Sequence, residues 1–383
     1  MSSLNRLRIG VLGAGIGGLA VAAALRKFGA EPVIFEQAPA FARIGAGIQQ
    51  SPNALMVHRG LGLEHRLRQT AFRPATSLNR DAVSGAVTND HPLGDTIEQR
   101  YGAPYLTLHR GDLHAALASL VPEGAIEFGR RLSAIDQGDG RVDLSFEDGT
   151  TRQVDLLIAA DGVHSTARDY VVGPTQARFT GRLAYRTTFP ASLLKVDIGP
   201  SRTKWWGGDR HIVIYYVTAA RDEVYFVTSQ PEAADWITKE SWSTKGRLDE
   251  LQAAFAAFNP EVRGVLASAP EVFKWGIFER DPLAAWSRGQ VVLLGDACHP
   301  MTPYMASGAS MALEDAVILA RVLSQSDDMG QALSLYEAVR KPRTSLVQAG
   351  SSANTWMRDA TNPDWLFGYD AWNAPLEVMQ PAA

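Results

Sequence analysis

The stretch RIGVLGAGIGGLAVAAALRKFGAEPVIFE, residues 8–36, decides the fold of this chain. The apolar run RIGVL at 8–12 is typical of a buried parallel strand, and the alanine- and leucine-rich residues 17–28 have the composition of a helix. PVIFE at 32–36 predicts a second strand. The stretch therefore predicts a βαβ unit at the start of an α/β domain.

The glycines between the predicted strand and the predicted helix form a G-x-G-x-x-G motif. Gly13 permits the tight turn, Gly15 lets a pyrophosphate approach the backbone, and Gly18 lets the helix pack closely on the strand. Glu36 ends the second strand, 36 minus 13 or 23 residues after the first glycine, where a carboxylate can bind a ribose hydroxyl. The motif predicts a dinucleotide site, and a glycine-rich turn without a ligand is the alternative.

The same region has one feature of an export signal, because residues 9–25 carry no charge and follow Arg6 and Arg8. Five glycines make this run a poor helix interior, and the run is shorter than the roughly 20 apolar residues of a membrane-spanning helix. No other long apolar run occurs in the sequence. We therefore expect a soluble cytoplasmic protein that has no membrane partner.

Composition narrows the function classes further. The 383 residues include 46% hydrophobic and 20% charged side chains, which suits two globular domains or one large domain with an insertion. A net charge of -4 argues against nucleic acid as the main partner. The single cysteine, Cys298, allows neither an internal disulfide nor a cysteine-based zinc site, and we interpret it as a buried apolar side chain. No histidine or carboxylate pair has metal-ligand spacing, so we expect no metal.

Two further motifs follow runs that predict buried strands. Asp161 opens the sequence DGVHSTAR, for which the alternative is a helix start capped by Ser165 with Arg168 in solvent. Asp296 is the acidic residue of GDACHP, and a carboxylate beside a glycine at a strand end can reach a ribitol or ribose hydroxyl. All three motifs, in this order and at strand ends, indicate a bound dinucleotide.

The segment after the last of these motifs leads into a predicted helix. From Pro303 to Gly308 it can direct backbone N–H groups at a phosphate or a flavin ring. The helix predicted over 310–323 is amphipathic, and we interpret Glu314 as part of its solvent-facing surface. A long helix or a helix pair is predicted over 331–357.

Between residues 175 and 280 the pattern changes to short β-rich runs separated by Gly, Asp and Arg turns. We predict an antiparallel sheet inserted into the α/β domain. The expected domains are a cofactor-binding part at 1–174 that includes some strands of the inserted lobe, a β-rich substrate domain at 175–280, and a second cofactor-binding part with C-terminal helices at 281–383.

With these motifs in this order, the chain resembles the single-component flavin-dependent aromatic hydroxylases, which share the para-hydroxybenzoate hydroxylase fold. The resemblance covers nearly the whole chain. It implies tightly bound FAD, hydride from NADH or NADPH with NADH favoured, and O₂ as co-substrate for hydroxylating an electron-rich ring. It also implies that Arg43 and Arg110 contact the FAD. A single G-x-G-x-x-G motif agrees with transient nicotinamide binding, and a homodimer is compatible with the resemblance.

The resemblance and the strand pattern together indicate the substrate side. Hydroxyl transfer needs a nucleophilic ring, which a phenol or hydroxypyridine becomes when a base removes its proton. His211 is predicted as this base, with a pKa near neutral, and Tyr215 lies on the same face of its strand as a second catalytic residue. Tyr225, on the next predicted strand, is predicted to bind substrate. The alternatives are a surface or core histidine and two ordinary strand tyrosines.

Gln49, Arg202 and Tyr304 occupy positions where the resemblance implies contact with the substituents of the ring. Arg202 can form a bidentate pair with a substrate carboxylate, and a solvated loop arginine is the alternative. We expect a hydroxylated aromatic acid as substrate, with a hydroxypyridine carboxylate such as 6-hydroxynicotinate favoured. CO₂ would leave where attack falls on the carbon that bears the carboxylate. A hydroxybenzoate or salicylate hydroxylase and a flavoprotein oxidase are the alternative functions.

Overall fold

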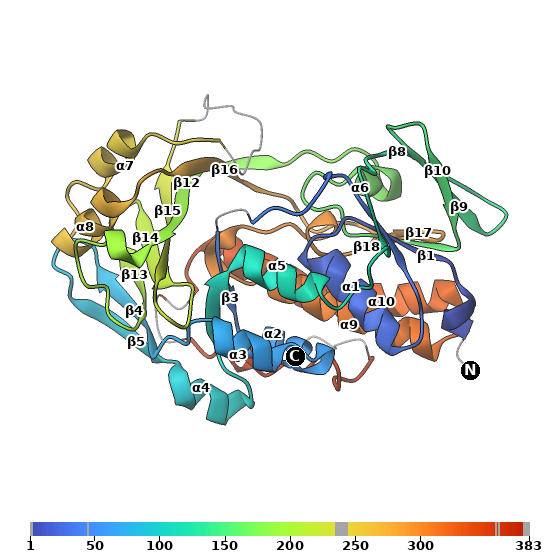
Figure 1. Ribbon diagram of the computed structural model, residues 1–383, viewed down its shortest axis with the longest axis horizontal. Helices are drawn as coiled ribbons and strands as arrows, with labels where there is room; N and C mark the ends of the chain where they lie inside the picture. Colours follow the sequence, from blue (N-terminus) through green and yellow to red (C-terminus); the bar gives the residue numbers. More distant parts are fainter. Residues whose placement is uncertain (1–2, 44–45, 234–243, 357, 359–360, 378–383) are drawn as a thin grey trace.

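The computed structural model describes residues 3–43, 46–233, 244–356, 358 and 361–377. Figure 1 shows two large sheets at opposite ends of the molecule, and long helices lie beside the sheet on the right. This mixed α/β architecture confirms the predicted fold class. Within the described ranges, no helix is both long enough and apolar enough to cross a bilayer.

The N-terminal stretch forms the centre of a six-stranded sheet with the order β17-β18-β11-β1-β2-β7. β1 (Ile9–Leu12) pairs in parallel with β2 (Val33–Glu36) and with β11 (Leu156–Ala159). β18 (Val291–Leu293) pairs in parallel with β11, and α1 (Ile16–Lys27) joins β1 to β2 as predicted. Because β1, β11 and β18 are neighbours that run in parallel, the three motif loops that follow them leave the same edge of the sheet.

The second large sheet has seven strands in the order β16-β12-β15-β14-β13-β4-β5. β4 (Thr76–Asp81) and β5 (Val87–Pro92) come from the first part of the chain. The other five are β12 (Arg178–Pro190), β13 (Arg202–Trp206), β14 (His211–Tyr216), β15 (Glu223–Pro231) and β16 (Phe273–Glu279). The five strands between residues 178 and 279 pair only antiparallel, which confirms the predicted inserted sheet. β4, from the first part of the chain, extends this sheet by pairing in parallel with β13 and antiparallel with β5. The domain boundaries stay a prediction.

The seven-stranded sheet has two faces of different character, because side chains alternate along each strand. One face carries Trp205, Ile212, Ile214 and Phe226, which pack in an apolar core with α7 (Leu248–Ala254) and α8 (Pro260–Ser268). The opposite face carries alternate residues from β13, β14 and β15, and we call it the inner face. Its residues, with their partners on β4 and β12, are Ser77, Asn79, Asp81, Arg182, Ala184, Arg186, Thr188, Arg202, Lys204, Trp206, His211, Val213, Tyr215, Tyr225, Val227 and Ser229.

Smaller elements connect these two sheets. The remaining strands are β3 (Gly47–Gln50), β6 (Leu106–His109), β7 (Ile126–Phe128), β8 (Leu132–Gly138), β9 (Arg141–Phe146), β10 (Thr151–Val154) and β17 (Ser287–Arg288). The remaining helices are η1 (Ser3–Arg6), α2 (Pro52–Leu61), α3 (Glu64–Thr70), α4 (Gly94–Tyr101), α5 (Arg110–Ala118), α6 (Thr166–Val172), η2 (Ala191–Leu193), η3 (Gly295–Ala297), η4 (Pro303–Met305), α9 (Gly308–Gln325), α10 (Met329–Ala353) and α11 (Asp364–Phe367). α10 is a single helix with Pro342 inside it.

A buried cluster of charges joins α9 to α10. Glu314 and Asp315 on α9 both pair with Arg340 on α10, at 2.7 Å each, and Glu314 also pairs with Arg343 at 2.8 Å. Glu314, Asp315 and Arg340 have no exposed area, so the interpretation of Glu314 as a surface residue is wrong. Asn53 Nδ2 donates to Glu314 Oε1 at 2.7 Å, which ties α2 to the same cluster.

Candidate cofactor and substrate site

The three glycines of the motif, Gly13 and Gly15 before α1 and Gly18 in its first turn, have three different surroundings. Gly13 has φ +93°, and a Cβ there would lie 2.6 Å from the carbonyl oxygen of Ala160. A Cβ at Gly18 would overlap the carbonyl oxygen of Gly13. A Cβ at Gly15 would meet no atom within 4 Å, although Gly15 is the N-cap of α1. The structure thus leaves open space at the N-terminus of this helix, where phosphate groups bind.

Glu36 closes the glycine turn from the next strand. Its Oε2 accepts from the N–H of Ala14 at 2.7 Å, and its Oε1 accepts from the N–H of Ala38 at 2.8 Å. Each carboxylate oxygen can accept a further hydrogen bond, so both oxygens are available as acceptors for a ribose hydroxyl. Arg43 makes different contacts from those expected, because it pairs with Asp112 at 2.9 Å and with Glu223 at 2.8 Å. Its predicted contact with FAD stays a prediction.

Arg168 holds the two acidic motif loops together. Its Nη2 donates to the carbonyl oxygens of Gly162 at 3.2 Å and Asp296 at 2.8 Å, and its Nε donates to Ala297 O at 2.8 Å. Arg168 is 1% exposed, so the alternative of a solvated arginine is wrong, although Ser165 does cap α6 by accepting from the N–H of Arg168. Asp161 and Asp296 therefore belong to two loops with a fixed relative position.

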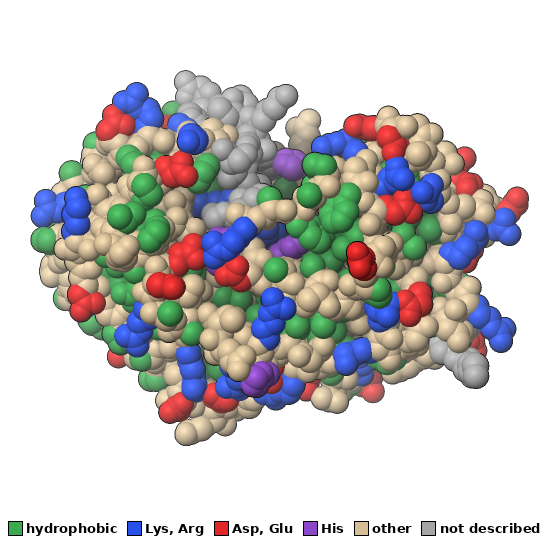
Figure 2. Space-filling model, viewed as in Figure 1, with side chains coloured by type: hydrophobic (Ala, Val, Ile, Leu, Met, Phe, Trp, Pro, Cys, Tyr) green, Lys and Arg blue, Asp and Glu red, His purple; other side chains and the backbone are tan. Residues whose placement is uncertain are grey.

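The carboxyl groups of these two loops keep acceptor capacity that the described residues do not use, although Asp161 Oδ2 accepts from the N–H of Ala167 at 3.3 Å. Asp161 Oδ1 is buried without a hydrogen-bond partner among the described residues, and burial raises the pKa of Asp161. Burial also raises the pKa of Asp296 and lowers that of Arg110, although water reaches both side chains. A side chain that is exposed to solvent and also surrounded by protein atoms lines a hollow. Figure 2 shows a hollow with basic and histidine side chains between the two ends of the molecule.

These residues fit a flavin dinucleotide. The open space at Gly15 can hold a pyrophosphate, and Glu36 can bind a ribose hydroxyl. Asp161 Oδ1, which has no partner among the described residues, and the exposed Asp296 can accept hydrogen bonds from further hydroxyl or ring N–H groups. A Cβ at Gly308 would lie 3.8 Å from Asp296 Oδ1, which places the start of α9 beside this carboxylate.

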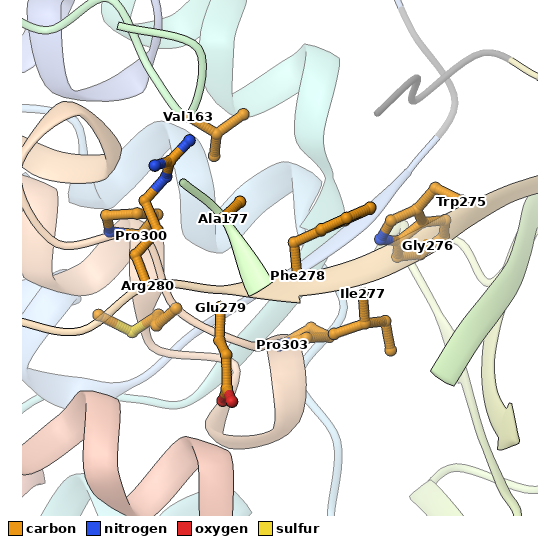
Figure 3. Close-up of a pocket in the computed structure, with 11 residues that line it drawn as sticks. Val163, Ala177, Trp275, Gly276, Ile277, Phe278, Glu279, Arg280, Pro300 and Pro303 are labelled. Carbon is orange, nitrogen blue, oxygen red and sulfur yellow. The ribbon is translucent and has the colours of Figure 1, made fainter. Parts of the chain in front are cut away.

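The loop after β18 also faces the second sheet. A pocket of about 620 Å³, including its open mouth, is lined by Val163, by Pro300, Met301 and Pro303, and by residues of β16 (Figure 3). In Figure 3 Pro303 lies beside Ile277 of this strand in the view, and Pro300 lies near Arg280. The cofactor loops and the substrate lobe thus share one boundary.

The predicted catalytic residues lie together on the inner face. His211 and Tyr215 are on β14, and Tyr215 pairs in register with Tyr225 on β15, with ring centroids 5.2 Å apart. A Cβ at Gly47 of β3 would meet both tyrosines. Tyr304 of η4 stands 5.6 Å from the His211 ring between centroids, and its hydroxyl lies 3.0 Å from Ser229 Oγ. Two cofactor-side segments, β3 and η4, therefore contact this face from opposite ends.

Gln49 and Arg202 lie near the tyrosine pair. Tyr105, which the sequence did not indicate, donates its hydroxyl to Gln49 Oε1 at 2.6 Å. Arg202 Nη1 donates to Ser77 Oγ at 2.8 Å, and Arg202 Nε is buried without a partner in the described part of the chain. The alternative of Arg202 as a solvated loop residue is wrong, because Arg202 lies on β13 and is 9% exposed.

Cations surround His211. Burial lowers the pKa of His211 well below its usual value, and the nearby charges of Lys204, Arg182 and Arg202 lower it further. Burial raises the pKa of Tyr225 to about 12 and that of Tyr215 well above 10. At neutral pH the site thus holds a neutral imidazole and two protonated phenols, and the predicted near-neutral pKa of His211 does not hold for the protein alone.

The sequence did not indicate three other cations of the inner face, one of which is Arg182 on β12. Lys204 is two residues from Arg202 on β13, and Arg186 on β12 stacks on the Trp275 ring at 4.7 Å. The alternation of β13 could have revealed Lys204, since it shares a face with Arg202. Arg186 could not be assigned because its role depends on which strands pair.

Comparisons with known proteins agree with this arrangement. A family model described as an FAD binding domain matches residues 6–351. The 6-hydroxynicotinate 3-monooxygenase of Bordetella bronchiseptica is 45% identical over 382 residues, covering 98% of each chain. The 3-amino-4-hydroxybenzoate 2-monooxygenase of Streptomyces cremeus is 41% identical over 342 residues, covering 89% of this chain and 85% of that one. The structure of Klebsiella pneumoniae HpxO complexed with FAD and uric acid has a TM-score of 0.80 and 27% identity, over 91% of this chain and 87% of that one.

Proposed function

The chain belongs to the FAD-binding family of flavin-dependent aromatic monooxygenases, and we propose that it hydroxylates a hydroxylated aromatic acid. The favoured substrate is a hydroxypyridine carboxylate such as 6-hydroxynicotinate, because two relatives with this activity are 45% and 42% identical over nearly the whole chain. NADH is the favoured hydride donor and O₂ the oxygen donor.

One observation carries this proposal, namely a buried arginine that has no acidic partner in the described part of the chain and lies beside two paired tyrosine rings. Arg202 has a free Nε at 9% exposure, and its guanidinium matches a carboxylate in geometry. The rings of Tyr215 and Tyr225 offer apolar surface for an aromatic ring. A flat ring with a carboxylate complements both features.

Bound FAD, once reduced by the nicotinamide, supplies an oxygen atom from O₂ in electrophilic form. The residues of this chain then have three tasks: Asp161, Asp296 and the turn at Gly15 hold the cofactor, Arg202 orients the acid, and His211 accepts the proton of the ring hydroxyl. An anion among the cations of the inner face offsets the charges that depress the pKa of His211, so substrate binding makes the imidazole a stronger base.

Removing this base should slow the reaction strongly. We expect His211→Ala to lower kcat on the order of 10²-fold, which is the usual loss of a general base, while FAD content stays unchanged. Stopped-flow hydroxylation rates measured across pH test this. A variant with the wild-type rate and pH profile would exclude His211 as the base.

A panel of hydroxypyridine and hydroxybenzoate acids, scored by the rate of flavin reduction, tests the substrate. We expect NADH oxidation to be stimulated most by a hydroxypyridine carboxylate, with one hydroxylated product per NADH. Fastest stimulation by a hydroxybenzoate or salicylate would favour the alternative hydroxylase, and peroxide formed without dependence on any acid would favour an oxidase. Product mass decides whether the carboxylate leaves as CO₂.

A further inference from the structure

Lys204 is a buried cation whose charge has no acidic partner among the residues that the structure describes. It is 3% exposed at the centre of the inner face, and its Nζ lies 3.8 Å from the centroid of the Trp206 ring. In the described ranges no carboxylate pairs with it. Burying an ammonium group without a counter-charge costs several kcal/mol, so a protein seldom keeps one without a use.

The charged side chains that lower the pKa of Lys204 are themselves cations. Arg202 is on the same strand, and Arg182 is on β12. The guanidinium carbon of Arg358 lies 5.2 Å from the centroid of the Trp206 ring, which Lys204 also contacts. His211 lies opposite Trp206 in the strand register, with ring centroids 5.0 Å apart. Arg182 donates to Ser229 Oγ at 2.8 Å and to Asp209 O at 2.7 Å, which are neutral acceptors. Burial lowers the pKa of Lys204, and the charges of Arg202, Arg358 and Arg182 lower it further. An anion bound here would be attracted by all of these cations.

Arg202 and Lys204 can bind one small ligand together. They are two residues apart on one strand and share a face, which sets their Cα atoms about 6.6 Å apart. This spacing is comparable to the width of a six-membered ring with substituents on opposite carbons. Each cation can therefore take a different substituent of one ring.

We propose that Lys204 is a specificity-determining residue whose ammonium group holds the ionised ring oxygen of the substrate while Arg202 holds its carboxylate. This assignment rests on the proposed function. The O–H bond of the ring breaks, its proton passes to His211, and the electron pair left on oxygen is held by Nζ–H groups of Lys204. The inner face then selects rings that carry two anionic groups over rings that carry one.

Binding measurements on the oxidised holoenzyme test this without turnover. The probes are 6-hydroxynicotinate and 6-methoxynicotinate, which differ in the ionisable oxygen, and the readout is the change in flavin absorbance on titration. In wild type we expect the hydroxy acid to bind more tightly. Lys204→Met should weaken the hydroxy acid at least about 30-fold, as loss of one buried charge contact does, and change the methoxy acid little. Lys204→Arg keeps a cation and should restore most of the affinity.

A second readout reports the ionisation directly. The near-ultraviolet absorption of the bound hydroxy acid should show the ionised ring in wild type and in Lys204→Arg, but the neutral ring in Lys204→Met at the same pH. Equal losses for both acids, or an ionised ring in Lys204→Met, would overturn the assignment while leaving the proposed function standing. If neither these nor the other aromatic acids perturb the wild-type flavin, the proposed function fails and this assignment fails with it. FAD content and Tm of each variant confirm that it is folded.

Discussion

Gly15→Val is expected to give a folded protein that no longer holds FAD. The backbone of Gly15 is extended, with φ -74° and ψ -174°, which a valine adopts without strain. A side chain there enters the open space at the N-terminus of α1 rather than the core. Because that space is where the pyrophosphate must approach backbone N–H groups, the branched side chain blocks the cofactor and not the fold. We expect at least about a 100-fold loss of FAD affinity, worth about 2.7 kcal/mol.

Gly18→Val is the matched control within the same motif. Its Cβ would overlap the carbonyl oxygen of Gly13, so we expect loss of folding, seen as low soluble yield and lost near-ultraviolet circular dichroism. Purified Gly15→Val should be colourless, cooperative in thermal unfolding, and unchanged in Tm by added FAD. Yellow Gly15→Val protein with normal flavin content would contradict the assignment of this turn.

Arg340→Met is expected to destabilise the protein by about 3–5 kcal/mol. Arg340 is fully buried and pairs with both Glu314 and Asp315, so a methionine of similar length leaves a carboxylate uncompensated in the core. Urea unfolding measures the loss. Arg321→Met is the control, because the acceptors of Arg321 among the described residues are the neutral carbonyls of Ala371 and Ala374, and its loss should cost much less.

The difference in unfolding free energy between wild type and Arg340→Met should decrease as the pH falls. Burial raises the pKa values of Glu314 and Asp315, but Arg340, with Arg343 and His299, outweighs burial and leaves both pKa values below their usual range. A carboxyl group with a lowered folded-state pKa contributes stability above its unfolded pKa, and this stability is lost as pH falls through the folded value. The unfolded state is common to both proteins, so the stability gap between wild type and Arg340→Met depends on the native carboxyl groups. Without Arg340 these groups take up protons at a higher pH than in wild type, so the gap should shrink as the pH falls from neutral towards pH 3. A gap that stays constant from pH 7 to pH 3 would contradict this.

The sequence was sufficient for those parts of the site that depend on local pattern. The turn at Gly13 and the carboxylate at Glu36 are set within one βαβ unit, and the structure places them as the motif requires. Asp161 and Asp296 were found because acidic residues after buried strands recur at the edge of parallel sheets.

The remainder depended on contacts between distant segments. Glu314 and Asp315 are adjacent on a helix and both buried, which an amphipathic pattern cannot indicate because it assumes one solvent-facing side. The alternative of a solvated Arg168 could not be excluded from the sequence, because two of its acceptors, the carbonyl oxygens of Asp296 and Ala297, are 128 and 129 residues away. Alternation along β13 was sufficient to place Lys204 on the face of Arg202, but its charged neighbours Arg182 and Arg358 come from segments that the sequence does not bring together.

The parallel pairing of β4 with β13 constrains the order in which the chain can fold. Thr203 pairs with Leu78, so the edge of β4 must wait during synthesis until a strand far along the chain has left the ribosome. Until then only its hairpin with β5 can form, and its other edge lies open to pairing with other nascent chains. Contact order across this sheet is correspondingly high, so its assembly is expected to set the slow phase of refolding, and a chaperone that shields β4 would raise the yield of native protein.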